Sequence, residues 1–362
     1  MRQFIILIVL LSSTIPFVYS SVTDDCTITK FSQVNTVLSS CKNIIISNLL
    51  VPGGEQLLLN LQNGSTLTFE GVTKFEVFHW EGPLVKVVGD NVTVEGAPGS
   101  ILNAQGEKYW DGQGGAGGVT KPRFFYIQTT GGSVFRNIYL LNCPLFCLII
   151  AAQDISVTGW VLDSVAGDKD LIALNTDGIG ISTNSNNVLV ENCTVLNQDD
   201  CIVVNAGNNI RFRNVHCYGS HGLSFAVGFG SQKYNNSVAN VTFEDSFLAN
   251  GLYGIHFKVS PNGNEGHLQN IVFRNIRLSG IQEDGIYIQQ DYGDIGNLGS
   301  NMKIHNLTIE NVYGSVQGEL TRPIHIFCGN HSTCYDWKFS GINIIGGGPS
   351  YCNYEPEGFS CN

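Results

Sequence analysis

The sequence has few charged residues for its length, because Asp, Glu, Lys and Arg make up only 14% of its 362 residues. Glycine is frequent instead, with 42 residues. This profile is typical of a large all-β protein with many turns and not of a helical one. Basic residues are also fewer than acidic ones, 19 against 30, so the net charge is −11. An acidic surface argues against nucleic acid or an anionic membrane as a partner.

Long apolar runs are missing as well. The apolar run at residues 4–11 is too short to span a bilayer. It follows Met1-Arg2 and precedes small or polar residues that end at Ser20, which predicts a secretory signal peptide at residues 1–20. Residues 21–362 contain no recognisable linker and are predicted to form a single domain of a secreted, extracellular glycoprotein. The seven Asn-x-Ser/Thr sequons that export would open to glycosylation start at Asn63, Asn91, Asn192, Asn235, Asn240, Asn306 and Asn330.

Metal-binding cysteine patterns, such as two CxxC pairs, are absent from the 11 cysteines. In an exported chain these cysteines indicate disulfides, and their odd number leaves at least one thiol unpaired. The partners of Cys143, Cys147 and Cys193 stay open, and a buried free thiol among them is the preferred interpretation. Closeness in sequence favours four disulfides, namely Cys26–Cys41, Cys201–Cys217, Cys328–Cys334 and Cys352–Cys361.

From about residue 43 the sequence consists of short β-branched and aromatic runs separated by Gly and Asn. Five runs alternate apolar and polar residues and close on Asn or Asp, at 188–192, 210–214, 241–245, 271–275 and 307–311. A second apolar run follows each, at 202–204, 223–225, 255–257, 286–288 and 324–326. The closing residues lie 22, 31, 30 and 36 residues apart, and no helical pattern intervenes. We therefore predict a right-handed parallel β-helix, with ladders of hydrogen-bonded Asn side chains at the turns. The strands of a β-sandwich would not repeat with aligned turn residues.

One short helix is expected at Phe31–Ser40. Val34, Val37 and Leu38 have helical spacing there, and Ser32 could serve as its N-cap. A helix at this point suits an end-cap, because the first coil of a solenoid otherwise exposes its apolar core and a strand edge.

Polar motifs recur at about one repeat length between residues 175 and 258. They are Asn175-Thr176-Asp177-Gly178, Gln198-Asp199-Asp200-Cys201, Gly219-Ser220-His221-Gly222 and His256-Phe257-Lys258. If one repeat is one coil of the solenoid, these side chains occupy equivalent positions on consecutive coils. Carboxylates on neighbouring coils would then be about 5–7 Å apart, given the spacing of strands. Each motif alone is more often a structural turn, but their conjunction predicts an active site that splits an acidic sugar polymer.

Three crowded carboxylates suit glycoside hydrolysis. One carboxyl must stay protonated to donate a proton to the leaving oxygen, while the others must be ionised to hold and deprotonate water. Mutual repulsion raises one pKa and so assigns these roles.

With these motifs the chain resembles a polygalacturonase, one of the pectin-hydrolysing glycoside hydrolases of family 28, which are right-handed β-helices. The family motifs Asn-Thr-Asp, Asp-Asp, Gly-His-Gly and Arg-Ile-Lys are matched in this order, the last only in part. The cysteines at 201 and 217 and at the C-terminus also fit, and the resemblance covers essentially the whole mature chain. Supporting matches are Trp80-Glu81-Gly82-Pro83, Trp110-Asp111-Gly112 with Lys121-Pro122, and Gln290-Asp291-Tyr292.

The resemblance implies roles for four catalytic residues. Asp199 would be the general acid, and Asp177 and Asp200 would activate the water, so that the reaction inverts the anomeric centre. His221 would tune or shuttle the proton of the acid. No metal or other cofactor is needed.

The resemblance also implies that Lys258 binds a substrate carboxylate and that Tyr292 lines the neighbouring subsite, with Asn175 and His256 as further substrate-binding residues. The chain departs from the family at His256, where the family has Arg, at Gly180, where the family usually has an acid, and at Ser220, where it has Gly. An imidazole is charged only near or below its unperturbed pKa of about 6.5. We therefore expect substrate affinity to weaken as the pH rises through the titration of His256.

The function that the resemblance implies is endo-hydrolysis of de-esterified pectin by a monomer, with pectin or polygalacturonic acid as substrate and plant inhibitor proteins as further partners. A pectate lyase is one alternative, since it shares the fold, but it needs calcium and a basic residue to abstract a proton. A catalytically impaired relative that binds pectin or engages inhibitors is another, and His256 is its main support. Three clustered Asp residues favour hydrolysis.

Overall fold

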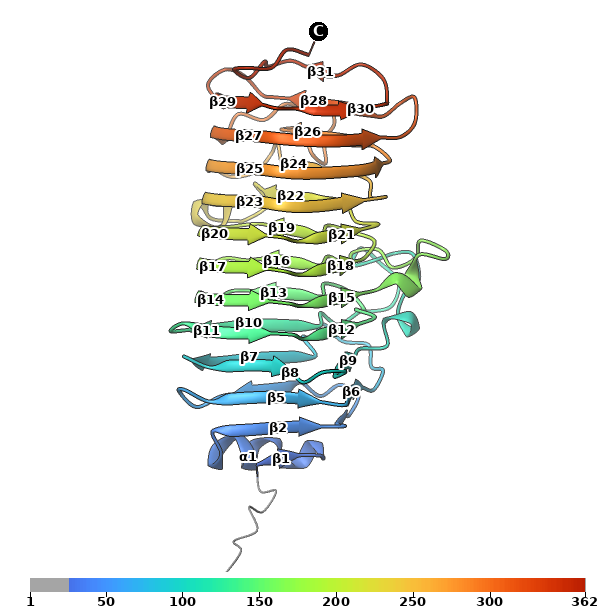
Figure 1. Ribbon diagram of the computed structural model, residues 1–362, viewed down its shortest axis with the longest axis vertical. Helices are drawn as coiled ribbons and strands as arrows, with labels where there is room; N and C mark the ends of the chain where they lie inside the picture. The colour runs from blue at the N-terminus through green and yellow to red at the C-terminus, as the bar shows by residue number, and fades with distance from the viewer. Residues whose placement is uncertain (1–25, 362) are drawn as a thin grey trace, which may run out of the picture.

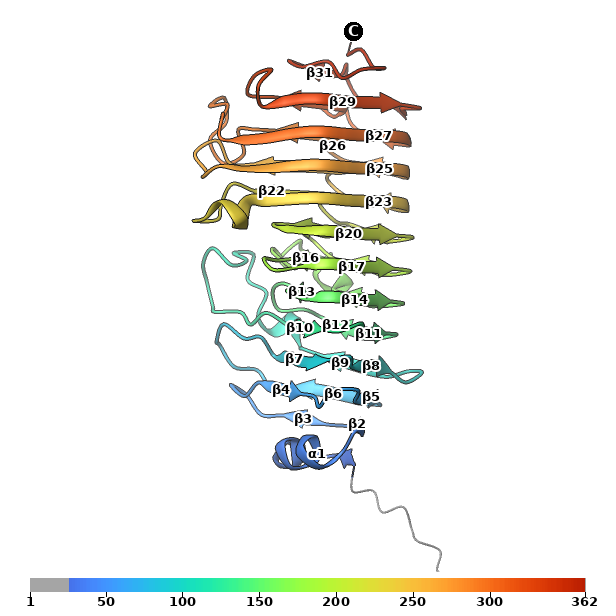
Figure 2. The same cartoon turned by 90° about the vertical axis from the view of Figure 1, so that its left-hand side faces the viewer.

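The structure is a computed structural model that describes residues 26–361, and it confirms a right-handed parallel β-helix. Its coils stack along one long axis, from the N-terminal helix to the C-terminus (Figure 1). Strands pair in parallel within one sheet of 20 strands and one of 11 (Figure 2). The predicted signal at residues 1–20 lies outside the described residues, among which no helix is both long and apolar enough to cross a membrane.

The 11-stranded sheet receives one strand from each coil that reaches it. In chain order these strands are β4 (Leu57–Asn60), β7 (Val85–Asp90), β10 (Phe125–Thr130), β13 (Leu148–Ile150), β16 (Ile179–Ile181), β19 (Ile202–Val204), β22 (Leu223–Val227), β24 (Ile255–Val259), β26 (Asp284–Gln289), β28 (Arg322–Phe327) and β31 (Tyr351–Cys352).

The 20-stranded sheet receives two short strands from most coils and one long strand from later ones, since β23 pairs with both β20 and β21. Its strands are β1 (Thr27–Ile28), β2 (Asn43–Ser47), β3 (Leu50–Val51), β5 (Thr66–Glu70), β6 (Val72–Phe75), β8 (Thr93–Gly96), β9 (Ile101–Asn103), β11 (Ser133–Arg136), β12 (Tyr139–Leu141), β14 (Gln153–Thr158), β15 (Val161–Asp163), β17 (Asn186–Glu191), β18 (Thr194–Leu196), β20 (Gly207–Arg213), β21 (His216–Tyr218), β23 (Ser237–Ala249), β25 (Gly266–Ile281), β27 (Met302–Val316), β29 (Cys334–Ser340) and β30 (Asn343–Ile345).

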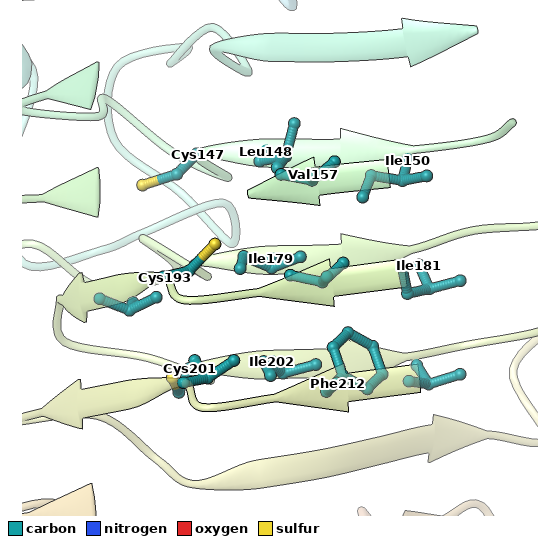
Figure 3. Packing of buried hydrophobic residues seen from close by; sticks show 14 of the residues in the cluster. Cys147, Leu148, Ile150, Val157, Ile179, Ile181, Cys193, Cys201, Ile202 and Phe212 are labelled. Atoms are coloured by element: carbon teal, nitrogen blue, oxygen red, sulfur yellow. The ribbon is translucent and has the colours of Figure 1, made fainter. Parts of the chain in front are cut away.

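The core forms because inward side chains of successive coils stack in register. Leu148, Ile179 and Ile202 pair across β13, β16 and β19, and all three are fully buried. Figure 3 shows them facing Val157 and Phe212 of the other sheet. Alternation of apolar and polar residues therefore places one face of each strand inside the coil and the other outside.

The residue that closes each predicted strand has a left-handed backbone, with φ of 56° at Asn192, 51° at Asn214 and 54° at Asn311. Asparagine tolerates this conformation better than most residues with a side chain. The Nδ2 of Asn214 donates to the Oδ1 of Asn192, and Asn311 donates likewise to Asn275, both over 2.8 Å. The predicted ladders are confirmed.

The N-terminal end is covered by a 3₁₀ turn, η1 (Phe31–Gln33), that continues into α1 (Val34–Ser40) (Figure 1). The expected N-cap, Ser32, is wrong, because it lies inside the turn. The Oε1 of Gln33 accepts instead from the backbone N–H groups of Thr29 and Lys30, over 2.9 and 2.8 Å. The other 3₁₀ turns are η2 (Gly106–Lys108), η3 (Val165–Gly167) and η4 (Lys233–Asn236).

The disulfides confirm the four pairs that closeness in sequence favoured and add Cys143–Cys147. Cys193 is the buried free thiol of the described chain. Burial raises its pKa to about 12, so the thiol stays protonated and packs as a small apolar group (Figure 3).

Candidate active site

A cleft of about 890 Å³ runs along the outward face of the 11-stranded sheet. It crosses β13, β16, β19, β22, β24 and β26, so it follows the long axis of the solenoid. Because the strands pair in register, each contributes an equivalent outward residue to one row: Ile149, Gly180, Val203, Ser224, His256 and Tyr287.

The polar motifs meet at one edge of this cleft. Asp177, Asp200 and His221 each lie two residues before their strand, which is β16, β19 and β22 respectively. The predicted equivalence on consecutive coils therefore holds for these three. It is wrong for His256 and Lys258, which lie inside β24 and reach the same edge from within the strand.

Asp199 and Asp200 lie in the connection between β18 and β19 and not within a strand. Neighbouring side chains there need not point in opposite directions, so both carboxyls can line the cleft. The backbone N–H of Asp200 donates to Oδ1 of Asp199 over 2.7 Å. The next residue, Cys201, is bonded to Cys217, which ties this turn to the coil that carries His221.

Asp199 is held by groups on both sides of it. Nδ1 of His221 lies 3.5 Å from its Oδ1, and the backbone N–H of Asn175 donates to its Oδ2 over 3.2 Å. The side chain of Asn175 also reaches Oδ2, over 3.3 Å, and its own Oδ1 accepts the N–H of Gly115 over 2.9 Å. Asn175 thus connects Asp199 to the loop between β9 and β10, which projects from the stack in Figure 2.

Asp200 is almost fully buried, and both of its oxygens have partners. Oδ1 accepts from the hydroxyl of Ser224 over 2.7 Å, and Oδ2 forms a hydrogen-bonded ion pair with the ammonium of Lys258. By contrast, Oδ1 of Asp177 is buried and has no hydrogen-bond partner within residues 26–361. The three carboxyls therefore share one cleft but have different surroundings.

These surroundings separate the three pKa values. Burial, together with the charges of Asp199 and Asp200, raises the pKa of Asp177 well above its usual value. Burial also raises the pKa of Asp200, and Lys258 offsets only part of this effect. For Asp199, burial opposes ionisation, but the hydrogen bond and charge of His221 outweigh it and lower the pKa. The three carboxyls therefore differ in how readily they ionise, since the pKa of Asp177 and that of Asp200 are raised and that of Asp199 is lowered.

Asp177→Asn is expected to stabilise the protein at pH 8. The folded state raises the pKa of Asp177, so the contribution of this group to stability is complete below its unfolded pKa and is lost as the pH rises through its folded pKa. An amide cannot ionise, so the variant avoids this loss, and its free energy of unfolding at pH 8 should be higher than that of the wild type by about 1–3 kcal/mol. Urea unfolding of both forms at pH 8 and pH 4 measures the effect. The gain should shrink at pH 4, and an equal gain at both pH values would contradict the raised pKa.

His256 lines the cleft among aromatic and amide side chains, which disfavour the expected cation. The residue is only 3% exposed. Its ring stacks on Tyr287 at 5.2 Å and packs against Tyr253 at 4.1 Å, and its Nε2 lies 2.9 Å from Nε2 of Gln289. Burial, and then the charge of Lys258, hold the pKa of His256 well below its usual value. The titration predicted to weaken substrate affinity should therefore occur at a lower pH than that of a free imidazole, and the prediction stays open to measurement.

Two further residues named from the sequence also lie at the cleft. The ammonium of Lys258 is 5.8 Å from the ring centre of Tyr292, which is 37% exposed at the rim. Tyr253 was missed, although it lies two residues before β24, the position that Asp177, Asp200 and His221 hold on earlier coils. Ser224 carried no signal in the sequence, because only the strand register places it against Asp200.

One group of the described residues, Asp199, Asp200 and His221, has ligand atoms within 4.8 Å of one another and could in principle hold a metal ion. The ammonium of Lys258 already occupies Asp200 and repels a cation there. That no cofactor is needed remains a prediction.

Comparison with known proteins supports this description. Residues 41–361 match the family model described as glycosyl hydrolases family 28. The chain is 42% identical to a polygalacturonase of Phaedon cochleariae over 93% of each chain, and 38% identical to endopolygalacturonase I of Aspergillus niger over 93% of this chain and 91% of that one. The solved structure of endopolygalacturonase I from Stereum purpureum, complexed with two galacturonates, superposes with a TM-score of 0.82 at 28% identity, covering 91% of this chain and 96% of that one.

Proposed function

Because this chain belongs to glycosyl hydrolases family 28, we propose that it is a polygalacturonase that cleaves the α-1,4-galacturonosyl bonds of de-esterified pectin internally and with inversion. The observation that carries the proposal is the group of three carboxyls and His221 at the edge of a long cleft. The cleft continues on both sides of the carboxyls, toward Phe146 and toward Tyr287, so a polymer can occupy both sides of the cleaved bond. This supports endo-action.

Asp199 is proposed as the general acid. Of the three carboxyls it is the most exposed, at 9%, and the side chain of His221, which contacts it, is 26% exposed. Substrate in the cleft removes water from Asp199 and brings its own carboxylates close. Both effects raise the pKa of Asp199 in the complex, which lets it bind the proton that it lacks at rest. Asp199 then donates this proton to the glycosidic oxygen.

Asp177 and Asp200 are proposed to hold the water that attacks the anomeric carbon from the opposite face, and Asp200, the carboxylate paired with Lys258, to take up the proton of this water. Lys258 pairs with Asp200, which lowers the pKa of this carboxyl and so favours its ionised form. Asn175 and Tyr292 contact the sugar, and His256 contacts it as a neutral group.

A pectate lyase is less well supported than a hydrolase. A lyase needs a free base, and Lys258 is the strongest base at the edge of the cleft. Burial lowers its pKa, but the charge and hydrogen bond of Asp200 raise it by more, so the amine stays protonated. A non-catalytic binder would have no need of the Asp199–His221 contact.

The test is a reducing-end assay on polygalacturonic acid between pH 4 and pH 8. The proposal expects new reducing ends, no ultraviolet absorbance from a new double bond, a rapid fall in viscosity, and inverted product by NMR. Ultraviolet-absorbing product would identify a lyase, and binding without turnover at every pH would identify a binder.

Ser224→Ala should lower turnover about tenfold, since a hydrogen bond to a charged group is worth about 1.5–3 kcal/mol. It should also move the acidic limb of the pH profile upward, because Ser224 is one of the groups that lower the pKa of Asp200. Ser224→Thr, which keeps the hydroxyl, is the matched control. A fall in rate with an unmoved pH profile would show that Ser224 only packs.

We further propose that the protein is exported as a monomeric glycoprotein and that plant inhibitor proteins engage it. Six of the seven sequon asparagines are exposed and Asn235 is partly buried. Burial therefore does not prevent attachment of a glycan at any of them.

A further inference from the structure

The two halves of the cleft differ in charge. The half toward the N-terminus contains Arg123, whose guanidinium lies 3.1 Å from a carboxylate oxygen of Glu81. The two side chains are 39% and 75% exposed, so this surface ion pair is weak. Arg123 can exchange Glu81 for a carboxylate of the substrate.

Among the described residues, none that lines the half toward the C-terminus is such a free cation. Its lining consists of aromatic, amide and apolar side chains, those of Tyr253, His256, Tyr287, Gln289, Tyr292 and Ile295. The nearest permanent charge is Lys258, whose ammonium is already paired with Asp200. Asp177 and Asp199 lie close by, so this ammonium compensates the carboxyls of the site itself.

His256 stands where the family has Arg, and its surroundings keep it neutral by geometry. Its ring is enclosed by Tyr253 and Tyr287, and its Nε2 meets the amide of Gln289. Its Nδ1 is buried without a hydrogen-bond partner among the described residues. None of the groups that it contacts among the described residues is a carboxylate that could stabilise an imidazolium.

We propose that the C-terminal half of the cleft accepts a galacturonosyl residue whose carboxyl is a methyl ester, while the N-terminal half requires a free carboxylate. The ester carbonyl still accepts a hydrogen bond from Lys258, and the methyl group can pack on Tyr292 and Ile295, which are 37% and 79% exposed. A neutral pocket loses little when the bound carboxylate becomes neutral, whereas a site built on a free guanidinium loses a charge-assisted bond. This inference rests on the proposed hydrolase function and narrows its substrate to partly methyl-esterified pectin.

The products of cleavage show which kind of sugar residue, ester or free acid, was bound in each half of the cleft. The two residues that flank a cleaved bond become the new reducing end and the new non-reducing end of the products. Pectin with randomly placed methyl esters on about half of its residues is digested, and the ends are sequenced by mass spectrometry. We expect one kind of new end to carry methyl esters at close to their frequency in the substrate and the other kind to be almost entirely free acid.

His256→Arg adds the missing cation and should lower the ester content of the permissive end about tenfold relative to wild type, in line with a charge-assisted pair. His216→Arg, on the other sheet, makes the same substitution away from the cleft and should leave both ends as in wild type. The wild-type asymmetry is decisive even if His256→Arg fails to fold. Esters excluded equally from both ends of wild-type products would overturn the inference.

Absence of new ends from any pectin would instead refute the proposed hydrolase. Calorimetry of wild-type protein with hexagalacturonate and with hexamers of about half esterification then decides the inference. A loss of affinity of less than about threefold on esterification supports the neutral pocket, and a larger loss overturns it.

Discussion

Asp199→Asn is expected to remove nearly all hydrolysis of polygalacturonate, a loss of about 10²–10⁴-fold, while the β-helix stays folded. The amide keeps the shape of the carboxyl and can still accept from Asn175 or from the N–H of Asp200. It cannot give a proton to the glycosidic oxygen in the same way. The measurement is kcat from reducing ends at the optimum pH, beside circular dichroism and the melting temperature of the same sample.

The matched control for this change is Asp336→Asn. Asp336 is exposed on β29 with a φ of 57°, a backbone conformation that asparagine tolerates well, and it does not line the cleft. It should turn over substrate like wild type. If Asp199→Asn keeps more than about a tenth of the wild-type rate, the loss is too small for a general acid, and that role is contradicted. In that case Asp177, whose pKa is raised by burial and by the neighbouring carboxyls, becomes the candidate acid.

Lys258→Met should have the second-largest effect, a fall in kcat of about 10²-fold, because the site loses a preorganised charge that stabilises its ionised carboxylates. Lys258 lowers the pKa of Asp177, Asp199 and Asp200. Its removal raises all three, so the water-activating carboxylates ionise only at higher pH. The acidic limb of the pH profile should therefore move upward, as measured by kcat/KM between pH 3.5 and pH 8.

A double variant separates the effect of losing Lys258 on stability from its effect on turnover. Lys258→Met alone leaves Asp200 as an unpaired buried carboxylate and should lower the melting temperature at pH 7. Adding Asp200→Asn removes that charge and should recover most of the stability without recovering turnover. Recovered turnover in the double variant would mean that Lys258 acts only by relieving Asp200 and that neither group takes part in the reaction.

The repeating part of the fold was predictable because its determinants are local. Alternating side chains fix which face of a strand is buried, and an Asn at the end of the run supplies a left-handed turn, so residues 188–192 and 307–311 already describe a coil. Repetition of that pattern then specifies the stack. The same reasoning explains why Asp177, Asp200 and His221 were found, since each occupies one position of the repeat, two residues before its strand. Tyr253 shared that position but carried no acid–base chemistry to draw attention to it.

The sequence by itself thus determined the fold, the family and which motifs line one cleft, whereas the tertiary structure decided how their side chains pair and in which direction each pKa is shifted. Residue type gives an intrinsic pKa, but burial and partners change it, and these come from other coils. Lys258 pairs with Asp200 from 58 positions along the chain, and Gln289 meets His256 from 33 positions away. The spacing of motifs contains no record of such contacts. For this reason His256 looked like a weak cation in the sequence and is a neutral part of the cleft wall in the folded protein.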